Sequence, residues 1–367
     1  MTQAATIRME EVPWEECFLP TGRNPQLERE MRQRYGVVPP HIPYFAPCPW
    51  VPRAHEALAS PADRPAHLDP DLVQRIGLVV SQDNSCRYCF ASVRLFMRLR
   101  GVPEDRIRRL EQDVLVDDYP EHERTVLALA RRLSRADPLP GPEAFAALRD
   151  HGYSEEAIKE FACVVGGVCF ANRISTFAAV PPHTTEQLPD RWYMRLLRPL
   201  LARRLRRGRS EDDRDRREPG LPEGDFGYVA AGLEGLPIGR GVRQAIEMAW
   251  SSPHLSRRAR ALVIAVIGLG LGCELSVREA TRILGEEGLA PDEVERILRD
   301  LASPRLTPVE AVVVPFARET IWYRPAQVQR RAREVHAKLT GPQFLDLVGT
   351  SALGNLLCRL GPVLRLP

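Results

Sequence analysis

The sequence predicts an all-α protein in which one helical unit is repeated twice. Three observations support this prediction: two stretches of the chain align with each other, apolar residues recur at helical spacing within both, and breakers containing Gly or Pro fall between the segments. No stretch alternates polar and apolar residues in the way that is typical of a strand. The fold class therefore follows from periodicity, before any motif is considered.

The repeat becomes visible when VVSQDNSCRYCFASVRLFMRLRGV is set over VIGLGLGCELSVREATRILGEEGL. This alignment places Cys86 on Cys273. Farther along the chain, FACVVGGVCFANR (161–173) matches FLDLVGTSALGNL (344–356). Because the matching segments follow in the same order, we predict one fold present twice, with the two copies packed on each other as a pseudo-dimer.

We predict four parts in the chain. The segment 1–55 is rich in Pro and aromatic residues and is expected to be an extended arm, and 56–201 forms the first helical domain. The segment 202–225 carries dense mixed charge that cannot form a core, which predicts a linker. The second helical domain then occupies 226–367.

Composition excludes several functional classes. The net charge is only +3, which does not indicate a nucleic-acid-binding protein. The longest apolar run, 261–272, is too short to span a membrane. The N-terminus MTQAATIRMEEVPWEEC has acidic residues where a signal peptide needs an apolar core. We therefore expect a cytoplasmic protein without a membrane span.

The eight cysteines are scattered, and the only CxxC consists of Cys86 and Cys89. In a reducing compartment such a pair is more often catalytic or metal-binding than a static disulfide. The spacing alone leaves redox chemistry, half of a metal site and simple packing open. Cys163 and Cys169 do not form a second CxxC and are typical of small core residues, so a metal site lacks ligands.

Local sequence around the pair favours thiol chemistry. Asp83, Asn84 and Ser85 are good helix caps, so a helix is expected to begin here. Free backbone N–H groups and the helix dipole then favour a thiolate. Arg87 adds a positive charge between the cysteines, and Tyr88 offers a hydroxyl. Both are supporting candidates for the site.

The order of these elements resembles the carboxymuconolactone decarboxylase and alkylhydroperoxidase D-like family. The features that carry the resemblance are NSCRYC, a helix that ends in Gly, a second helix, a short acidic hairpin and a Gly/Asn-Arg helix, over about 60–185 and 245–365. The resemblance implies compact all-α domains that assemble as homo-oligomers. The cysteine pair favours the peroxidase-like branch, because the decarboxylases usually lack it.

The resemblance also implies roles for individual residues. Cys89 would attack a hydroperoxide, and Cys86 would resolve the resulting sulfenic acid into a disulfide. The family's glutamate, twelve residues before the first cysteine, is replaced by Gln74, and its histidine, four residues after the second cysteine, is replaced by Val93. None of the eight histidines stands at the spacing of this relay.

Further supporting candidates are His67 and Glu123, either of which could substitute for the missing base. In the second copy Ser276 stands opposite Cys89, so Cys273 has no CxxC partner and this copy is expected to be structural. The predicted function is a thiol-dependent oxidoreductase that reduces a hydroperoxide or disulfide, with an external thiol or dithiol as electron donor and no metal or cofactor. The alternative is a catalytically inactive relative of the family with a binding or assembly role.

Overall fold

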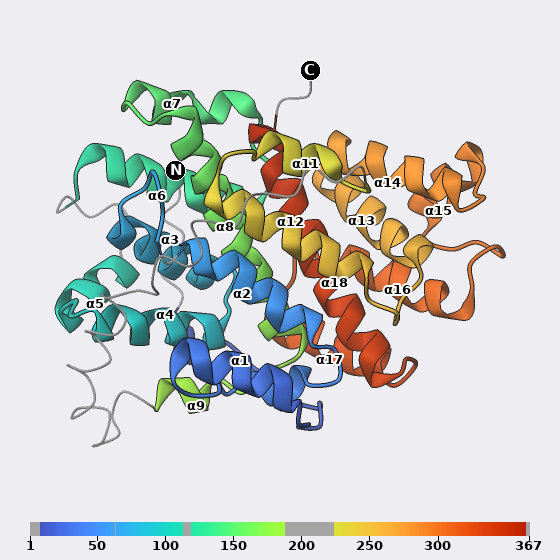
Figure 1. Cartoon of the computed structure of the whole chain (residues 1–367), viewed down its shortest axis with the longest axis horizontal. Helices are drawn as coiled ribbons and strands as arrows, with labels where there is room; N and C mark the ends of the chain where they lie inside the picture. Colours follow the sequence, from blue (N-terminus) through green and yellow to red (C-terminus); the bar gives the residue numbers. More distant parts are fainter. Residues whose placement is uncertain (1–7, 63, 113–118, 188–223, 365–367) are drawn as a thin grey trace.

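The computed structural model describes residues 8–62, 64–112, 119–187 and 224–364, and every regular element in these ranges is a helix (Figure 1). The all-α prediction is therefore confirmed. Within the same ranges, no helix combines the length and hydrophobicity that a membrane crossing requires. Of the predicted linker 202–225, only the last two residues are described.

Both aligned stretches contain a matching series of helices. The helices before the linker are α2 (Trp50–Ala62), α3 (Pro70–Asp83), α4 (Arg87–Leu99), α5 (Glu104–Gln112), α6 (Glu121–Arg135), α7 (Ala146–Asp150), α8 (Glu155–Phe177) and α9 (His183–Glu186). Those after it are α11 (Gly227–Gly232), α12 (Pro237–Trp250), α13 (Arg257–Leu271), α14 (Glu274–Glu286), α15 (Pro291–Asp300), α16 (Pro308–Glu319), α17 (Pro325–His336) and α18 (Gly341–Leu360).

The N-terminal segment 1–55 is not the extended arm that its composition suggested. Its described part contains a 3₁₀ turn η1 (Met9–Glu11), the helix α1 (Pro25–Tyr35), a second turn η2 (Ile42–Phe45) and the start of α2. Asn24 caps α1 by accepting a hydrogen bond from the Leu27 N–H, and Pro25 occupies its first turn. The prolines here therefore mark the starts of helices, which composition alone does not distinguish from an extended segment.

The same helix pairs are in contact in both copies. Helix α3 packs against α4, α6 and α8, and α13 packs against α14, α16 and α18. Between the copies, α8 packs against α18 and α2 against α12 (Figure 1). The second contact is close: a Cβ on Gly241 would lie 2.1 Å from the carbonyl oxygen of Ala57. A side chain at this position would separate α12 from α2.

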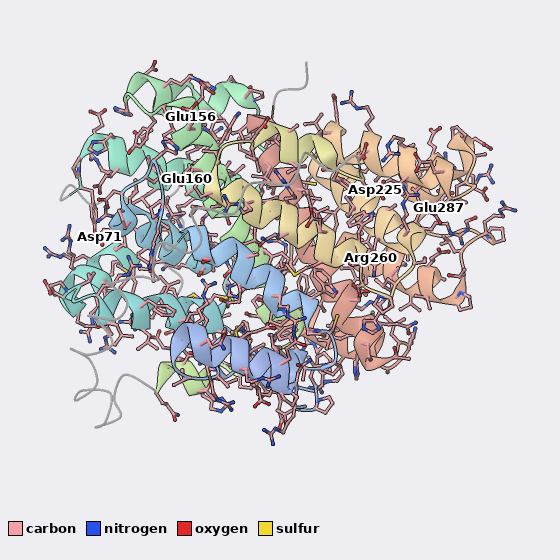
Figure 2. All side chains as sticks on the ribbon, viewed as in Figure 1. Asp71, Glu156, Glu160, Asp225, Arg260 and Glu287 are labelled. Carbon is pink, nitrogen blue, oxygen red and sulfur yellow. The ribbon has the colours of Figure 1, made fainter. Side chains whose placement is uncertain are left out.

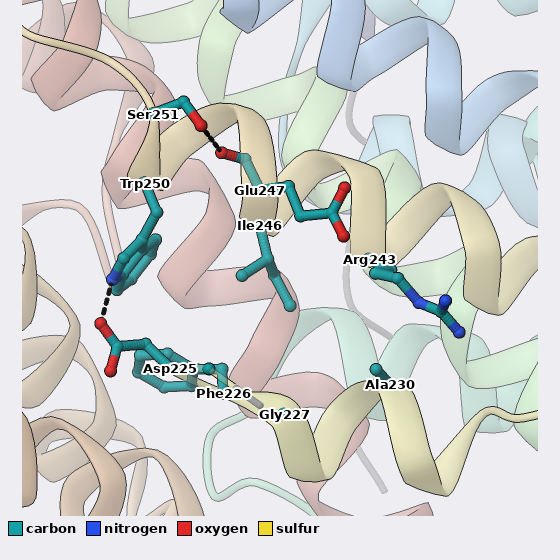
Figure 3. Close-up of a pocket in the computed structure, with 10 residues that line it drawn as sticks. Asp225, Phe226, Gly227, Ala230, Arg243, Ile246, Glu247, Trp250 and Ser251 are labelled. Atoms are coloured by element: carbon teal, nitrogen blue, oxygen red, sulfur yellow. Dashed lines mark hydrogen bonds between the residues drawn. The ribbon is translucent and has the colours of Figure 1, made fainter. Parts of the chain in front are cut away.

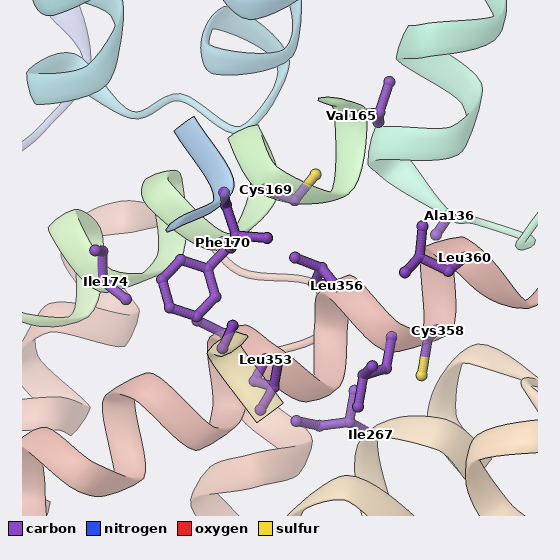
Figure 4. Packing of buried hydrophobic residues seen from close by; sticks show 14 of the residues in the cluster. Ala136, Val165, Cys169, Phe170, Ile174, Ile267, Leu353, Leu356, Cys358 and Leu360 are labelled. Atoms are coloured by element: carbon purple, nitrogen blue, oxygen red, sulfur yellow. The ribbon is translucent and has the colours of Figure 1, made fainter. Parts of the chain in front are cut away.

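A single hydrophobic cluster runs through both copies. Part of it appears in Figure 4, with Phe170 from α8 and with Leu353 and Leu356 from α18. Gly166 of α8 lets the helices approach, because a Cβ there would lie only 3.3 Å from the Leu356 Cγ. Burial of apolar area is the dominant favourable term in folding, so the two copies stabilise each other through this cluster.

Two fully buried arginines connect the copies in opposite directions. Arg173 of α8 donates to the carbonyl oxygens of Thr320 (3.3 Å) and Ile321 (3.0 Å), just after α16. Arg359 of α18 donates to the carbonyl oxygen of Ser134 in the last turn of α6 (2.6 Å). Each guanidinium thus meets carbonyl oxygens at the C-terminal end of a helix in the other copy, where the helix dipole favours a positive charge.

A buried carboxylate fixes the entry into α3. Glu160 of α8 is 1 % exposed and accepts hydrogen bonds from the backbone N–H groups of Ala66 (2.7 Å), His67 (2.8 Å) and Leu68 (2.9 Å). It lies in the interior of the first copy (Figure 2). These charge-assisted bonds satisfy three backbone donors and hold the chain where it turns into the helix that precedes the cysteine pair.

A second buried carboxylate performs the corresponding task before α13. Asp346 of α18 accepts hydrogen bonds from the Leu255 N–H (2.9 Å) and the Ser252 hydroxyl (2.9 Å), and from the Trp50 indole (3.0 Å). It also forms a fully buried ion pair with Arg260 (2.7 Å). Both copies therefore use a carboxylate from their last long helix to fix the start of an earlier helix, and among the residues that the structure describes only the second copy adds a counter-charge.

Candidate dithiol site

Cys86 and Cys89 lie at the start of α4, where the chain turns out of α3. Ser85 has a positive φ of 52°, which redirects the backbone just before the pair. Cys86 itself is the N-cap of α4, because its backbone is extended and its sulfur accepts a hydrogen bond from the Cys89 N–H (3.4 Å). The sequence-based cap at 83–85 is therefore wrong.

The residues expected to cap α4 instead end α3. Asp83 is the last residue of α3 and forms ion pairs with Arg131 (2.8 Å) and Arg135 (3.0 Å) of α6. The Asn84 amide donates to the Ser134 hydroxyl (2.8 Å). Because these side chains are already bonded to α6, a sulfur takes over the capping of α4.

Both sulfurs are buried, and a serine completes a group of three. Cys86 is 0 % exposed and Cys89 is 8 % exposed. The Cys89 thiol is within hydrogen-bonding reach of the Ser175 hydroxyl of α8, with 3.5 Å between the sulfur and the oxygen, and it lies close enough to the Cys86 sulfur for each to shift the pKa of the other. The two thiols are therefore partners in a site that excludes most solvent.

The surroundings of the two thiols shift their pKa values in opposite directions. Burial opposes the charged form of Cys86, but the hydrogen bond from the Cys89 N–H and the polar Cys89 thiol and Thr176 hydroxyl beside the sulfur outweigh it and lower the pKa of Cys86. Burial and the neighbouring Cys86 sulfur raise the pKa of Cys89, although Ser175 partly offsets them. When the reduced pair loses one proton, these opposite shifts favour the negative charge on Cys86 and the remaining proton on Cys89.

The N-terminal segment contributes a histidine that no spacing in the sequence singles out. His41 lies just before η2, and its Nδ1 is 2.9 Å from the Tyr88 hydroxyl. Burial, with the nearby His55, lowers the pKa of His41 to about 3, so its imidazole is neutral at physiological pH. The Nε2 atom of His41 is buried without a hydrogen-bond partner in the part of the chain that the structure describes.

Polar groups continue beyond His41. The His55 ring lies edge-on to His41, with centroids 5.9 Å apart, and its Nδ1 is 3.5 Å from a carboxylate oxygen of Glu56. Glu56 is 7 % exposed and accepts a hydrogen bond from the Tyr35 hydroxyl (2.6 Å). A series of polar side chains therefore extends from Tyr88 toward α1.

The second copy also reaches the first cysteine pair. Tyr323, in the connection between α16 and α17, buries its hydroxyl beside Thr176, and its ring is close to Arg173, with 5.5 Å from the guanidinium carbon to the ring centroid. Burial raises the pKa of Tyr323, and proximity to Cys86 adds to this rise. The hydroxyl is therefore a neutral donor near the sulfur that carries the negative charge.

The positions at which the resemblance implies a glutamate and a histidine lie on two helices that pack together, α3 and α4. Val93 of α4 packs against Gly77 of α3, since a Cβ on this glycine would lie 3.5 Å from a Val93 methyl carbon. Gln74 is half-buried and lies one turn before Gly77, on the same side of α3. These two positions therefore offer an amide and an apolar side chain in place of the acid and the base that the resemblance implies.

The remaining predicted residues have other roles. Arg87 forms an ion pair with Glu186 of α9 (3.1 Å). The side chain of His67 is exposed, and its backbone N–H bonds to Glu160. Glu123 forms an ion pair with Arg75 (3.0 Å), more than two turns before the end of α3.

The contacts of His67 and Glu123 in the described residues are thus with Glu160 and Arg75, and neither side chain has a contact with Cys86 or Cys89 there. Both were chosen from residue type, which carries no information on where a side chain points.

A pocket of about 380 Å³ lies elsewhere, between α11 and α12 (Figure 3). It is lined by residues from 224 to 251, among them Phe226 and Trp250, and no cysteine borders it. Across the described ranges, no three His, Cys, Asp or Glu side chains are grouped so that they could hold a metal ion.

The second copy contains a thiol pair that the sequence interpretation missed. Cys273 is the N-cap of α14, as Cys86 is of α4, and its sulfur lies 3.3 Å from the Ser276 hydroxyl. Its thiol partner is Cys358 of α18. The expectation that Cys273 has no partner is therefore wrong. Extending the second alignment by two residues sets Ser175 opposite Cys358, and this identifies the partner once the structure has placed Ser175 beside Cys89.

Comparisons of the chain with protein-family models, with curated proteins and with solved structures gave no match.

Proposed function

We propose that the chain is a thiol-dependent oxidoreductase, similar to the alkylhydroperoxidase D-like proteins, in which Cys86 and Cys89 alternate between dithiol and disulfide. One observation carries the proposal. The Cys86 sulfur accepts a hydrogen bond from the Cys89 N–H at the N-terminus of a helix, and the two thiols shift each other's pKa, that of Cys86 downward and that of Cys89 upward. A thiolate is the reactive form of cysteine, and a neighbouring thiol is what resolves its oxidised product.

In the proposed reaction, the Cys86 thiolate attacks one oxygen of a hydroperoxide. A sulfur–oxygen bond forms, the oxygen–oxygen bond breaks, and the departing alkoxide takes up a proton to become an alcohol. The Cys89 sulfur then attacks the sulfenic acid of Cys86, so that a disulfide forms and hydroxide leaves with the Cys89 proton as water. An external thiol or dithiol returns the two electrons and two protons.

The division of roles differs from the one that the resemblance implies. The resemblance assigns the attack to Cys89, whereas the hydrogen bonds favour Cys86 as the thiolate. Cys89 is the more exposed sulfur, but attack requires loss of a proton that its environment retains. We therefore propose Cys86 as the attacking sulfur and Cys89 as the resolving one.

Tyr88 and His41 provide the proposed route for protons in place of the absent glutamate and histidine. Their side chains are hydrogen-bonded at 2.9 Å, and Tyr88 also interacts electrostatically with both sulfurs. The departing alkoxide needs a proton within the buried site, and a phenol backed by an imidazole can supply one. Tyr323 belongs to the second copy and lies near Cys86, so we propose that it assists the same proton transfer. The second copy would then act as the partner of the first in a pseudo-dimer.

A second candidate function is a non-catalytic binding or assembly role. Burial of both sulfurs favours it, as does the position of the pocket between α11 and α12, away from the thiols. Whether peroxide oxidises Cys86 and Cys89 distinguishes the redox function from the binding or assembly role.

The test traps sulfenic acid with a 1,3-dione after stoichiometric hydrogen peroxide. In Cys89→Ser we expect the adduct on Cys86, and in Cys86→Ser we expect little adduct on Cys89. Wild type should give a Cys86–Cys89 disulfide that a dithiol reverses. Cys163→Ser, which removes a buried thiol outside both pairs, should behave as wild type.

Adduct on Cys89 in Cys86→Ser, with none on Cys86 in the other variant, would restore the roles implied by the resemblance. Thiols that stay reduced in all variants, while free cysteine is oxidised in the same solution, would reject the redox function and leave the binding role.

A further inference from the structure

The cysteine pair of the second copy joins residues that are distant in sequence. Cys273 precedes α14, and Cys358 lies in the last turn of α18. They are 4 % and 0 % exposed. Figure 4 shows Cys358 within the hydrophobic cluster, in the same helix end as Leu360. No sequence motif connects the two thiols, and their pairing arises only from the packing of α14 against α18.

The surroundings of Cys273 bring polar groups to its sulfur. The Ser276 hydroxyl is 3.3 Å from this sulfur, and the Cys358 thiol of α18, one turn before Gly361, lies close enough for each thiol to shift the pKa of the other. Gly361 leaves the space that the sulfur occupies, because a Cβ there would lie 3.0 Å from it. Tyr228 of α11 places its buried hydroxyl beside Ser276. Besides α14 itself, α18, the turn that follows α18 and α11 therefore surround the Cys273 sulfur.

The electrostatics match those of the first pair. Hydrogen bonding from Cys358, with smaller contributions from Ser276 and the backbone N–H groups of α14, lowers the pKa of Cys273 to about 6 despite burial. Burial and the Cys273 sulfur raise the pKa of Cys358. At neutral pH the pair therefore consists of a thiolate next to a thiol, the charge distribution from which a disulfide can form.

The two sites have the same three positions with two residues exchanged. In the first copy the positions are occupied by Cys86, Cys89 and Ser175. In the second copy Cys273 takes the place of Cys86, while serine and cysteine change places at the other two positions. Each site thus keeps one cysteine at the helix N-terminus, one second cysteine and one serine. The same contents at different backbone positions indicate a pair rather than two isolated core thiols.

We propose that Cys273 and Cys358 form a second redox-active dithiol, which a small hydroperoxide oxidises to an intramolecular disulfide. The Cys273 thiolate attacks one oxygen of the hydroperoxide, so that a sulfur–oxygen bond forms and the oxygen–oxygen bond breaks. The released alkoxide takes a proton from water. Cys358 then attacks the Cys273 sulfur, and hydroxide leaves with the Cys358 proton as water. The dithiol loses two hydrogen atoms, and the hydroperoxide becomes alcohol and water.

This site is independent of the function proposed above, because it uses none of the same thiols. The experiment therefore uses the full chain with Cys86→Ser and Cys89→Ser, treated with stoichiometric hydrogen peroxide and digested without reduction. We expect a peptide pair cross-linked through Cys273 and Cys358, with the mass of two hydrogens lost, which a dithiol separates again. Adding Cys358→Ser should abolish the cross-link, and Cys163 should stay reduced as an internal reference.

Mapping of wild-type protein in parallel requires no variant to fold and reports the two sites separately. A Cys273–Cys358 cross-link without a Cys86–Cys89 cross-link would reject the proposed function and support this inference. The reverse result would reject the inference alone. Oxidation of Cys273 to a sulfinic acid without a cross-link, or reduced thiols at both positions while the half-buried Cys17 is oxidised, would also overturn it.

Discussion

The two cysteine sites of this chain contain the same groups but obtain them differently. In the first copy both thiols come from one helical turn, with Ser175 arriving from α8. In the second copy the serine comes from the same turn as Cys273, and the second thiol arrives from α18. In both, the thiol at the N-terminus of a helix has the lowered pKa and its partner has the raised one.

The helix N-terminus, and not the CxxC spacing, therefore organises each site. Backbone N–H groups at the start of α4 and α14 stabilise a negative sulfur in both copies. The second thiol can come from the same helix or from a neighbour, provided that it reaches the first sulfur. A sequence motif detects the first arrangement only.

The largest expected effect comes from giving each copy the serine and second-cysteine positions of the other, because this should change which disulfide forms. Ser276→Cys combined with Cys358→Ser would give the second copy a CxxC, and the short contact between Cys273 and Ser276 places the new thiol within reach. We expect peroxide to form a cross-link between positions 273 and 276 in place of the natural one, detected by peptide mass analysis. In the first copy, Cys89→Ser with Ser175→Cys should move the cross-link to positions 86 and 175.

The single variants are the controls for this exchange. Cys358→Ser and Cys89→Ser alone should lose the cross-link at their own site completely and leave the other site unchanged. If neither double variant recovers a cross-link that its single variant lost, the two sites are not equivalent arrangements of the same groups.

A smaller difference is expected between the two buried carboxylates, Asp346 and Glu160, in how much each contributes to the free energy of unfolding. Asp346→Ala removes the counter-charge of buried Arg260 and should lower the free energy of unfolding by about 3–5 kcal/mol. Glu160→Ala leaves three backbone donors, two of them on exposed residues that water can reach, and should cost about 1–3 kcal/mol. Urea unfolding measures both.

Glu156→Ala, at an exposed position next to the start of α8, is the matched surface control and should have little effect. An equal loss of stability for Asp346→Ala and Glu160→Ala would mean that the ion pair with Arg260 contributes nothing beyond the backbone hydrogen bonds.

The mildest perturbation is a change of pH. Because the pKa of Cys273 is lowered to about 6, its thiolate is present above this value and is lost as the pH falls through it. Alkylation of Cys273 by a small reagent should be nearly constant above about pH 7 and fall about tenfold per pH unit well below pH 6, whereas an ordinary thiol continues to gain reactivity up to about pH 8.5. Mass analysis of the labelled peptide gives the rate.

Ser276→Ala should shift this midpoint upward, because it removes one hydrogen bond to the thiolate. Cys358 from α18 and Tyr228 from α11 are the titratable groups that face Cys273, and both keep their protons in this range because burial raises the pKa of each. A midpoint above about pH 8 in the wild-type protein would contradict the stabilised thiolate.

The helical class and the first thiol pair could both be predicted from the order of residues alone. Apolar periodicity and Gly or Pro breakers act within a few residues, so they indicate helices without knowledge of packing. Cys86 and Cys89 are separated by less than one helical turn, so any helix that starts there brings their sulfurs together. The cap was misplaced because Asp83 and Asn84 bond to α6, a distant partner.

The distant side chains that meet the sulfurs could be identified only once the helices were packed. His41 contacts Tyr88, which is 47 positions away in sequence, and Tyr323 comes from the other copy. Cys358 lies near Cys273 because α14 packs against α18. In the same packing the His67 N–H bonds to Glu160, and Glu123 pairs with Arg75. The physical reason is that local spacing fixes geometry within a turn, whereas contacts between helices depend on how their apolar faces pack, which residue type alone does not specify.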